Sequence, residues 1–398
     1  MIILKNATVI DGAGNPALLD ASIIINGNRI ESILTDAGPP DGADIVIDLK
    51  GKYVLPGLID AHIHLGGTDS FDYPAIGTRH DTYDYLKNRT EALKWGVTTI
   101  RSAGDHTPEI FEFRDEAAAR RYYSPRIVAA GKMVQARGGH PVYTVMGSDE
   151  NIVANACVIV DDATDIEAEI KRLIDSGADW IKTFISEIDK LNYPAPVPRI
   201  SAEQIRKIVD AAHKCGKPCM IHVDDALHFR EAAEAGADSI EHTLTGVATK
   251  TEIDDDVIET LIKNQTYVVP TIISIKAHEN PDGDLPLVYE KLLSQIGRLF
   301  RAGVNIGVGT DSGIPFVPVG ASLHDELAEL VKCGMSPVDA ITAATCGNAR
   351  LLRKEKEIGA ILPGYLADLV VVEGNPLENI TCTKNIYMVI ADGRIVRG

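Results

Sequence analysis

The middle of the chain alternates short apolar runs with amphipathic stretches, and this alternation limits the possible folds more than any other feature of the sequence. Several of the amphipathic stretches close on Gly, the usual end of a helix. Strands that alternate with helices predict a parallel sheet built from βα units. The eight strand candidates are LIDAHIHL (58–65), VTTIRSAG (97–104), RIVAAGKMV (126–134), WIKTFIS (180–186), CMIHVDD (219–225), DSIEHTL (238–244), YVVPTIIS (267–274) and NIGVGTDSG (305–313). Eight such units predict an α/β fold with a closed (β/α)8 TIM barrel, although an open sheet of seven or eight strands would give a similar pattern.

The two ends of the chain show a different pattern, in which apolar and polar positions alternate between turn signals such as NG, GN and DG. This pattern predicts short antiparallel strands at both ends. We therefore expect residues 1–55 and 358–398 to form one small β-sandwich domain and residues 56–357 to form the barrel. A chain of 398 residues can hold a barrel of about 250 residues and a smaller domain.

Composition indicates which partners and which cellular compartment to expect. The formal net charge is −18 at pH 7, and an acidic surface repels phosphate backbones, so no nucleic-acid partner is expected. The sequence contains no signal-peptide pattern and no uninterrupted apolar run of about 18 residues, so no membrane association is expected either. None of the six cysteines forms a C-x-x-C pair. We interpret them as reduced thiols of a cytoplasmic protein.

Groups that can bind a metal stand at the ends of five of the eight strand candidates. They are His62 and His64, Lys182, His222, His242 and Asp311. Side chains alternate along a strand, so His62 and His64 point to the same face and can reach one ion. Taken singly, a histidine hydrogen-bonded to a neighbouring strand or a turn-capping aspartate explains each of the other groups. Because the functional groups of a barrel lie at the carboxyl ends of its strands, the whole set favours one shared metal site.

Lys182 stands in the apolar run Trp180–Phe184, where burial is expected. A buried ammonium costs several kcal/mol unless it is paired or neutralised. Pairing with Glu187 or Asp311 is one solution. The other is reaction of the neutral amine with carbon dioxide to give a carbamate, N6-carboxylysine, an anion that could bridge two divalent cations.

At this point a family resemblance becomes visible. The run VLPGLIDAHIH at residues 54–64 resembles the first-strand signature of the amidohydrolase superfamily, and the Lys, His, His and Asp of the later strands follow in the superfamily's order. The segment PGYLADLVV at 363–371 resembles its returning β-sandwich segment. Ile181-Lys182 and Gly138-Gly139-His140 resemble the imidazolonepropionase-related group, which contains prolidase-like dipeptidases and arginine- or lysine-specific carboxypeptidases.

The resemblance implies a binuclear site with two divalent metal ions. By that resemblance His62, His64 and Asp311 would bind one ion, His222 and His242 the other, and carboxylated Lys182 would bridge them, while His140 would point at the substrate carbonyl. Zinc is the default metal because imidazole-rich sites suit it. Superfamily relatives are often dimers or larger, so a homo-oligomer is expected.

The leading hypothesis is a metal-dependent amidohydrolase that cleaves a C–N amide bond of a small substrate. A metal-bridging hydroxide would attack a dipeptide-like molecule, an N-acyl amino acid or a cyclic amide, and Asp311 would accept and pass on the proton. The alternative is a mononuclear deaminase of an amino-heterocycle, and a non-catalytic binding barrel is the third hypothesis. Retention of every ligand type argues against the third.

One departure from the group affects the substrate. Prolidase-like members commonly carry Tyr two positions after the fifth-strand histidine, whereas this chain has Asp224 there and Asp225 next. The acidic pair either attracts a cationic substrate group or consists of two solvated loop carboxylates, and the second interpretation is favoured. Deaminases usually carry H-x-x-E at this strand, and Asp225 at that spacing weakens the deaminase hypothesis.

Overall fold

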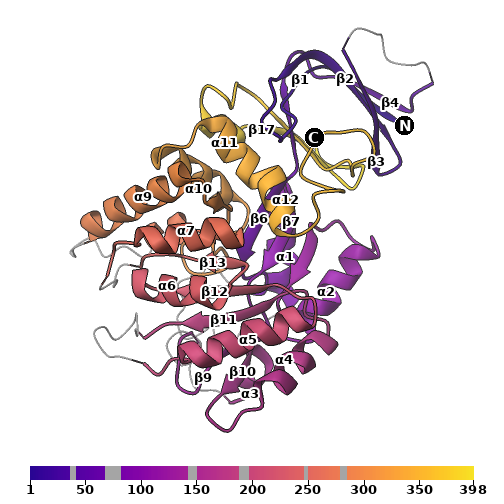
Figure 1. The fold of residues 1–398 in the computed structure, drawn as a ribbon. Coiled ribbons are helices and arrows are strands. Elements are labelled where there is room, and N and C mark those ends of the chain that lie inside the picture. The colour runs from indigo at the N-terminus through magenta and orange to yellow at the C-terminus, as the bar shows by residue number, and fades with distance from the viewer. Residues whose placement is uncertain (36–41, 68–81, 142–149, 188–196, 246–249, 278–284) are drawn as a thin grey trace.

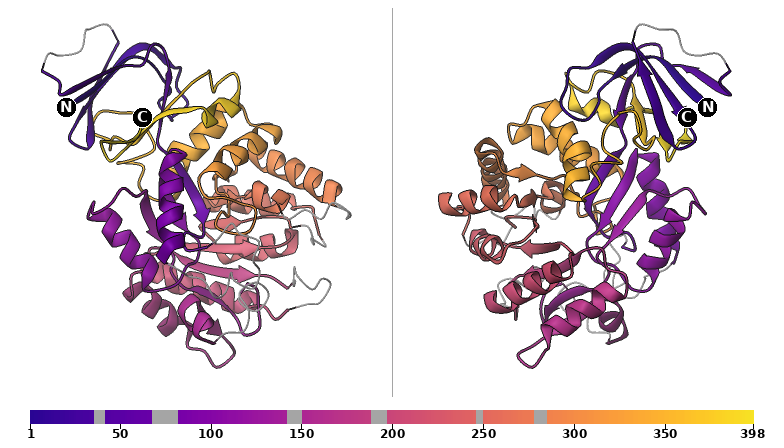
Figure 2. Two further views of the ribbon diagram at one scale, coloured as in Figure 1. Left: turned by 180° about the vertical axis from the view of Figure 1, so that it is seen from behind. Right: turned by 45° about the vertical axis from the view of Figure 1, so that its right-hand side comes forward.

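The computed structural model describes residues 1–35, 42–67, 82–141, 150–187, 197–245, 250–277 and 285–398. Parallel strands surrounded by helices occupy the middle of the chain, and a separate sheet at one end of the molecule contains both termini (Figures 1 and 2). The fold class predicted from the sequence, a barrel of βα units with a β domain made by the two chain ends, is confirmed. Among the described residues, no helix is long and apolar enough to span a bilayer.

The terminal sheet joins segments from opposite ends of the sequence. Its strands are β1 (Ile2–Val9), β2 (Leu18–Asn26), β3 (Arg29–Leu34), β4 (Ile45–Asp48), β5 (Tyr53–Pro56), β16 (Leu369–Val372), β17 (Ile386–Ala391) and β18 (Arg394–Arg397). The path β18-β17-β16-β5-β1-β2-β3 encloses its own apolar core. The expectation of antiparallel pairing alone is wrong, because β4 and β5 lie one after the other along the same edge of β1 and run parallel to it.

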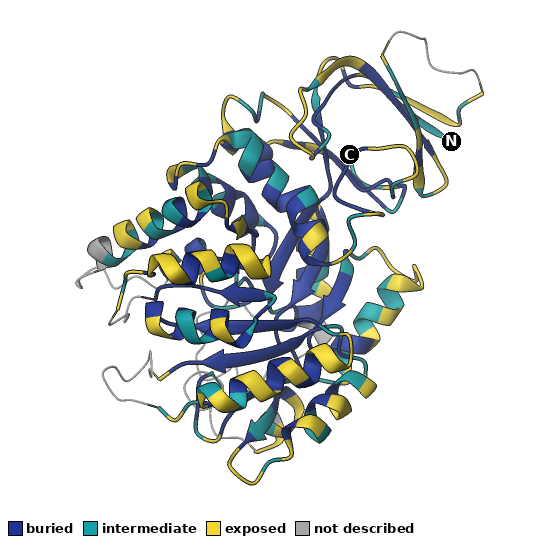
Figure 3. Cartoon of the chain, in the orientation of Figure 1, coloured by how far each residue is buried: buried dark blue, intermediate teal, exposed yellow. Residues whose placement is uncertain are grey.

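The barrel strands match the eight sequence candidates in order. They are β6 (Leu58–Ile63), β7 (Val97–Ser102), β8 (Arg126–Ala129) continued by β9 (Met133–Ala136), β11 (Ile181–Ile185), β12 (Cys219–Val223), β13 (Ser239–Glu241), β14 (Tyr267–Val269) and β15 (Asn305–Ile306). They are buried throughout almost their whole length (Figure 3). A further strand, β10 (Cys157–Val160), pairs with β9 at the sheet edge and was not among the candidates.

Helices cover the outside of the barrel strands. They are α1 (Thr82–Lys94), α2 (Glu109–Ala118), α3 (Glu150–Ala156), α4 (Ile166–Asp175), α5 (Ala202–Lys214), α6 (Ala226–Ala235), α7 (Asp255–Asn264), α8 (Ile272–Ala277), α9 (Leu285–Ala302), α10 (Ala321–Lys332), α11 (Pro337–Thr342) and α12 (Asn348–Leu351), with a π-helical turn at Ala343–Gly347 and a 3₁₀ turn at Ile380–Lys384. Local capping sets several starts: Ser201 and Gln204 form a capping box at α5. The outer faces of α5 and α7 are exposed (Figure 3), and the buried apolar residues of both helices belong to the barrel's hydrophobic core.

The barrel strands form a three-stranded and a seven-stranded sheet, and backbone contacts connect the two. Strand β8 pairs with β7, and its continuation β9 pairs with β11. On the other side, His62 O accepts hydrogen bonds from Asp311 N at 2.7 Å and Thr310 N at 3.2 Å. The Asn348 side-chain amide donates to Ile59 O and Val308 O, both at 2.7 Å, and so connects the two strands. Strand one and strand eight are therefore held side by side, and their ends meet.

The seventh strand is shorter than predicted. The sequence candidate reached Ser274, but β14 ends at Val269 and α8 begins at Ile272. The carboxylate of Glu326 on α10 accepts hydrogen bonds from Ile272 N at 3.0 Å and Ile273 N at 2.8 Å. A carboxylate at this position satisfies amides at the start of a helix, and it explains why the chain turns here instead of continuing as a strand.

The same glutamate predicts a pH dependence of stability. Burial raises the pKa of Glu326 from 4.5 to about 8, although the two amide donors oppose the shift. Between these values the folded protein holds a proton that the unfolded chain releases, so the contribution of Glu326 to stability falls as pH rises, by at most about 1.4 kcal/mol per unit. We expect Glu326→Gln to remove this slope in urea unfolding measured from pH 5 to 8. Parallel curves for variant and parent would contradict the expectation.

Candidate metal centre

The six residues predicted from strand ends, together with His140 from the family resemblance, lie at the carboxyl end of the barrel and form one connected group. Ring-centroid distances are 5.8 Å for His62 and His64, 4.8 Å for His62 and His242, and 4.3 Å for His242 and His222. His140 lies 5.1 Å from His222. Lys182 Nζ and His222 both contact the ring of Phe184, at 4.8 Å and 5.0 Å. Residues from the ends of six strands thus lie close together.

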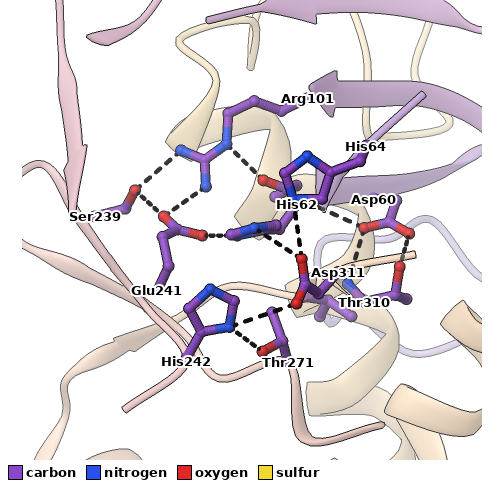
Figure 4. Close-up of polar contacts among 12 residues, drawn as sticks. Asp60, His62, His64, Arg101, Ser239, Glu241, His242, Thr271, Thr310 and Asp311 are labelled. Carbon is purple, nitrogen blue, oxygen red and sulfur yellow. Dashed lines mark hydrogen bonds and ion pairs between the residues drawn. The ribbon is translucent and has the colours of Figure 1, made fainter. Parts of the chain in front are cut away.

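The tightest part of this group is His62, His64 and Asp311. Their ligand atoms all lie within 4.8 Å of one another. Asp311 Oδ1 is 3.4 Å from His62 Nε2 and 3.2 Å from His64 Nε2, and Asp311 Oδ2 is 4.0 Å from His242 Nδ1 (Figure 4). The carboxylate therefore stands between three imidazoles.

The other ring nitrogens of the histidine pair already have acceptors. His62 Nδ1 lies 2.5 Å from Glu241 Oε2, and His64 Nδ1 lies 2.7 Å from the carbonyl oxygen of Gly104. Because both partners only accept, both Nδ1 atoms must donate, and in the neutral rings both Nε2 lone pairs point towards Asp311. Two lone pairs and a carboxylate repel one another unless a cation or a proton lies between them.

This donor set fits a divalent metal. His62 Nε2 is fully buried and has no hydrogen-bond partner of good geometry in the described part of the chain. Burial alone would lower the pKa of His64, but the hydrogen bond and charge of Asp311, together with the charge of Asp105 and the Gly104 carbonyl, outweigh burial, and the pKa lies above its usual value. In the metal-free protein a proton can thus relieve the contact, and a cation would take that proton's place.

Strand eight can approach strand one this closely because of its glycines. A Cβ at Gly309 would lie 2.7 Å from His62 Cβ, and at Gly313, where φ is +88°, it would lie within 1.9 Å of His64 O. Asp311 itself has φ +59°, and His242 has φ +79°. Left-handed backbone at non-glycine residues costs energy and clusters at functional sites, so the turn carries Asp311 towards the histidines at the expense of local strain.

The second half of the group consists of His242, His222 and Lys182, all nearly or fully buried. His242 Nδ1 contacts Thr271 Oγ1 at 2.7 Å. Burial, aided by the neighbouring His222, holds the pKa of His242 well below its usual value, so this ring is neutral and one of its nitrogens has a lone pair that can bind a cation. Lys182 is 1% exposed and faces the same interior as Phe184, as its strand position predicts.

The acidic pair after strand five differs from the favoured expectation. Asp224 and Asp225 are 0% and 4% exposed, so they are not solvated loop carboxylates. Asp225 caps α6 by accepting hydrogen bonds from Leu227 N and His228 N. Asp224 lies two positions after His222 on the same strand face, and its Oδ1 is 3.2 Å from His222 Nε2. Asp224 therefore directly contacts one of the predicted metal ligands, His222.

Sequence reasoning missed the polar residues that support the histidines. Asp60 accepts hydrogen bonds from Thr310 Oγ1 at 2.7 Å and from His62 N at 3.2 Å, and burial raises its pKa to about 7. Glu241 and Arg101 are 0% exposed and pair with each other at 2.8 Å beneath His62. The available signal was a charged residue inside a buried strand, which requires a partner nearby.

A barrel whose strand ends bring imidazoles, a lysine and a carboxylate together defines a barrel enzyme with a candidate centre for divalent metal. The amidohydrolase family model matches residues 53–396, and the chain belongs to this family. It is accordingly a hydrolase that acts on C–N bonds.

Individual relatives agree with the predicted group. A solved Xaa-Pro dipeptidase with methionine bound in its active site is 29% identical and superposes with a TM-score of 0.85, covering 100% of both chains. Ochratoxinase of Aspergillus niger is 24% identical over 100% of this chain and 86% of that protein. Imidazolonepropionase of Streptomyces coelicolor is 24% identical over 89% of this chain and 85% of that protein. The resemblance stated from sequence motifs is confirmed.

Proposed function

We propose that this chain is a binuclear metal hydrolase that cleaves the amide bond of a dipeptide-like substrate, an N-acyl amino acid or a cyclic amide. The observation that carries the proposal is that His62 Nε2 and His64 Nε2 both face the Asp311 carboxylate. The Nδ1 protons of both rings are already donated, to Glu241 and to the Gly104 carbonyl. Residues of this kind would hold one cation, and His222 and His242, with Lys182 as N6-carboxylysine between the two sites, would hold the second.

Two divalent cations, zinc by default, would supply an activated water and a Lewis acid for the scissile carbonyl. Asp311 is suited to moving the proton. Burial would raise the pKa of Asp311, but its contacts with His62 and His64 hold it well below the usual value, so the carboxylate is ionised at neutral pH. It can accept the proton of the nucleophile and deliver it to the leaving nitrogen.

His140 is the second residue to which we assign a catalytic role. It is 7% exposed, and its ring lies beside His222, in a position to face a carbonyl held by the group. A ring N–H aimed at that oxygen would stabilise the oxyanion of the tetrahedral intermediate. The similarity to an Xaa-Pro dipeptidase favours dipeptide-like substrates among the three classes.

The test is metal content per chain in the parent and in Lys182→Ala, measured by elemental analysis of protein purified without chelator. We expect about two ions in the parent. In the variant we expect a clear loss of metal and a fall in peptidase activity of more than about 100-fold, because the bridging anion is gone. A ¹³C carbamate signal after incubation with labelled bicarbonate should be present in the parent and absent in the variant.

Lys171→Ala is the matched control, because Lys171 is an exposed lysine on α4 that pairs with Asp175. It should change neither metal content nor activity. About one ion in the parent, unaffected by loss of Lys182, would refute the bridging lysine and direct the search to amino-heterocycles, with ammonia release as the assay.

A further inference from the structure

A charged network lies inside the barrel directly beneath His62. Arg101, on β7, and Ser239 and Glu241, both on β13, are each 0% exposed. Barrel interiors are usually filled by branched apolar side chains, and burying an ion pair carries a desolvation cost of several kcal/mol per ion. We therefore expect the buried ion pair of Arg101 and Glu241 to have a role beyond filling the barrel interior.

Arg101 is linked to His62 indirectly, by two routes. Its Nε donates to the carbonyl oxygen of Ala61, the residue before His62, at 2.5 Å. Its Nη2 donates at 2.8 Å to Glu241 Oε1, and the other oxygen of Glu241 contacts His62 Nδ1 (Figure 4). The guanidinium also lies 4.4 Å from the ring of Trp180. Arg101 thus fixes both the backbone before His62 and the carboxylate that contacts its ring.

The two oxygens of the Glu241 carboxylate have different hydrogen-bond partners. Oε1 accepts from Arg101 and from Ser239 Oγ. Ser239 Oγ in turn accepts from Arg101 Nη1 at 3.0 Å, which directs its own proton to Glu241. Oε2 remains for His62 Nδ1, and a carboxylate oxygen can only accept there.

We propose that Arg101 and Glu241 are positioning residues that hold His62 as the Nδ1–H tautomer, so that its Nε2 lone pair faces Asp311 and the proposed metal position. The functional value of this tautomer rests on the proposed metal site, whereas the tautomer itself can be observed without any metal. A ligating histidine that can adopt either tautomer would bind metal more weakly, because only one tautomer directs a lone pair at the ion.

Glu241→Gln makes a sharp test because a glutamine offers one oxygen and one NH₂ group. Arg101 and Ser239 both donate to the position of Oε1, so the amide oxygen should turn towards them. The NH₂ group then faces His62 Nδ1, which can only accept, and the ring proton moves to Nε2. The substitution should therefore invert the tautomer with almost no change in shape.

The experiment is ¹⁵N NMR of the metal-free, histidine-labelled protein, with the His62 signals assigned by comparison with His62→Asn. We expect Nδ1–H in the parent and Nε2–H in Glu241→Gln. Zinc affinity, measured against a competing chelator, should fall about 10- to 100-fold. Glu329→Gln is the control, since Glu329 is also buried and paired, with Lys276 and Lys332, but lies on α10 away from the histidines.

If Glu241→Gln does not fold, Glu241→Asp keeps the charge opposite Arg101 and withdraws the oxygen from His62. It should yield a mixture of tautomers and weaker zinc binding. An unchanged Nδ1–H tautomer in the variant that folds, or an unchanged zinc affinity, would overturn the proposal. A parent protein that binds no zinc would instead refute the proposed function, while the tautomer result would still decide whether Glu241 positions the ring.

Discussion

An Asp311→Asn protein is expected to fold normally and to lose about 10²- to 10⁴-fold in kcat, the range associated with a general acid–base group. The amide can donate to the Nε2 lone pairs of His62 and His64, which now lie 3.4 Å and 3.2 Å from the carboxylate. In the metal-free protein these amide donors take the place of the proton that relieves the repulsion around the carboxylate, so the contacts are kept without its charge. What it loses is the anionic charge opposite a cation and the base that moves the proton.

The diagnostic result is the combination of an unchanged or higher urea midpoint with a loss of activity and of bound metal. Asp325→Asn is a suitable control, because Asp325 is a half-buried aspartate on α10 that pairs with Lys384. It should leave activity and metal content unchanged. An Asp311→Asn enzyme with more than about a tenth of the parent kcat would contradict the role assigned to Asp311.

The predicted ligands could be found from the sequence because they stand in or directly after barrel strands. The rule that functional groups stand at the carboxyl ends of barrel strands is local, and it applies to His222, His242 and Asp311 without knowledge of any partner. Alternation along a strand likewise placed His62 and His64 on one face. The fold followed from the same periodic signals.

The supporting residues could not be found in this way, because their roles depend on contacts between distant segments. Glu241 is 179 residues from His62 and 140 from Arg101 in the sequence, and nothing near any of the three identifies the others. The burial of Asp224 and the early end of β14 could not be predicted for the same reason, because both depend on contacts with distant segments. The second depends on Glu326, which lies 54 residues after Ile272.

Replacement of Arg101 by Met should produce a large loss of stability, on the order of 3–5 kcal/mol, because it leaves the Glu241 carboxylate charged and unpaired inside the barrel. Arginine and methionine are similar in length, so the loss reports charge and hydrogen bonding more than a cavity. The hydrogen bond to Ala61 O and the contact with Trp180 disappear as well.

A double-mutant cycle separates these contributions. Adding Glu241→Gln to Arg101→Met removes the unpaired charge, so the double variant should be more stable than Arg101→Met alone. Urea unfolding of the metal-free proteins provides the measurement, since bound metal would add its own stabilisation. Equal stabilities for the single and double variants would mean that the buried carboxylate is neutralised in another way, and the inference that Arg101 holds Glu241 as an anion beneath His62 would fail.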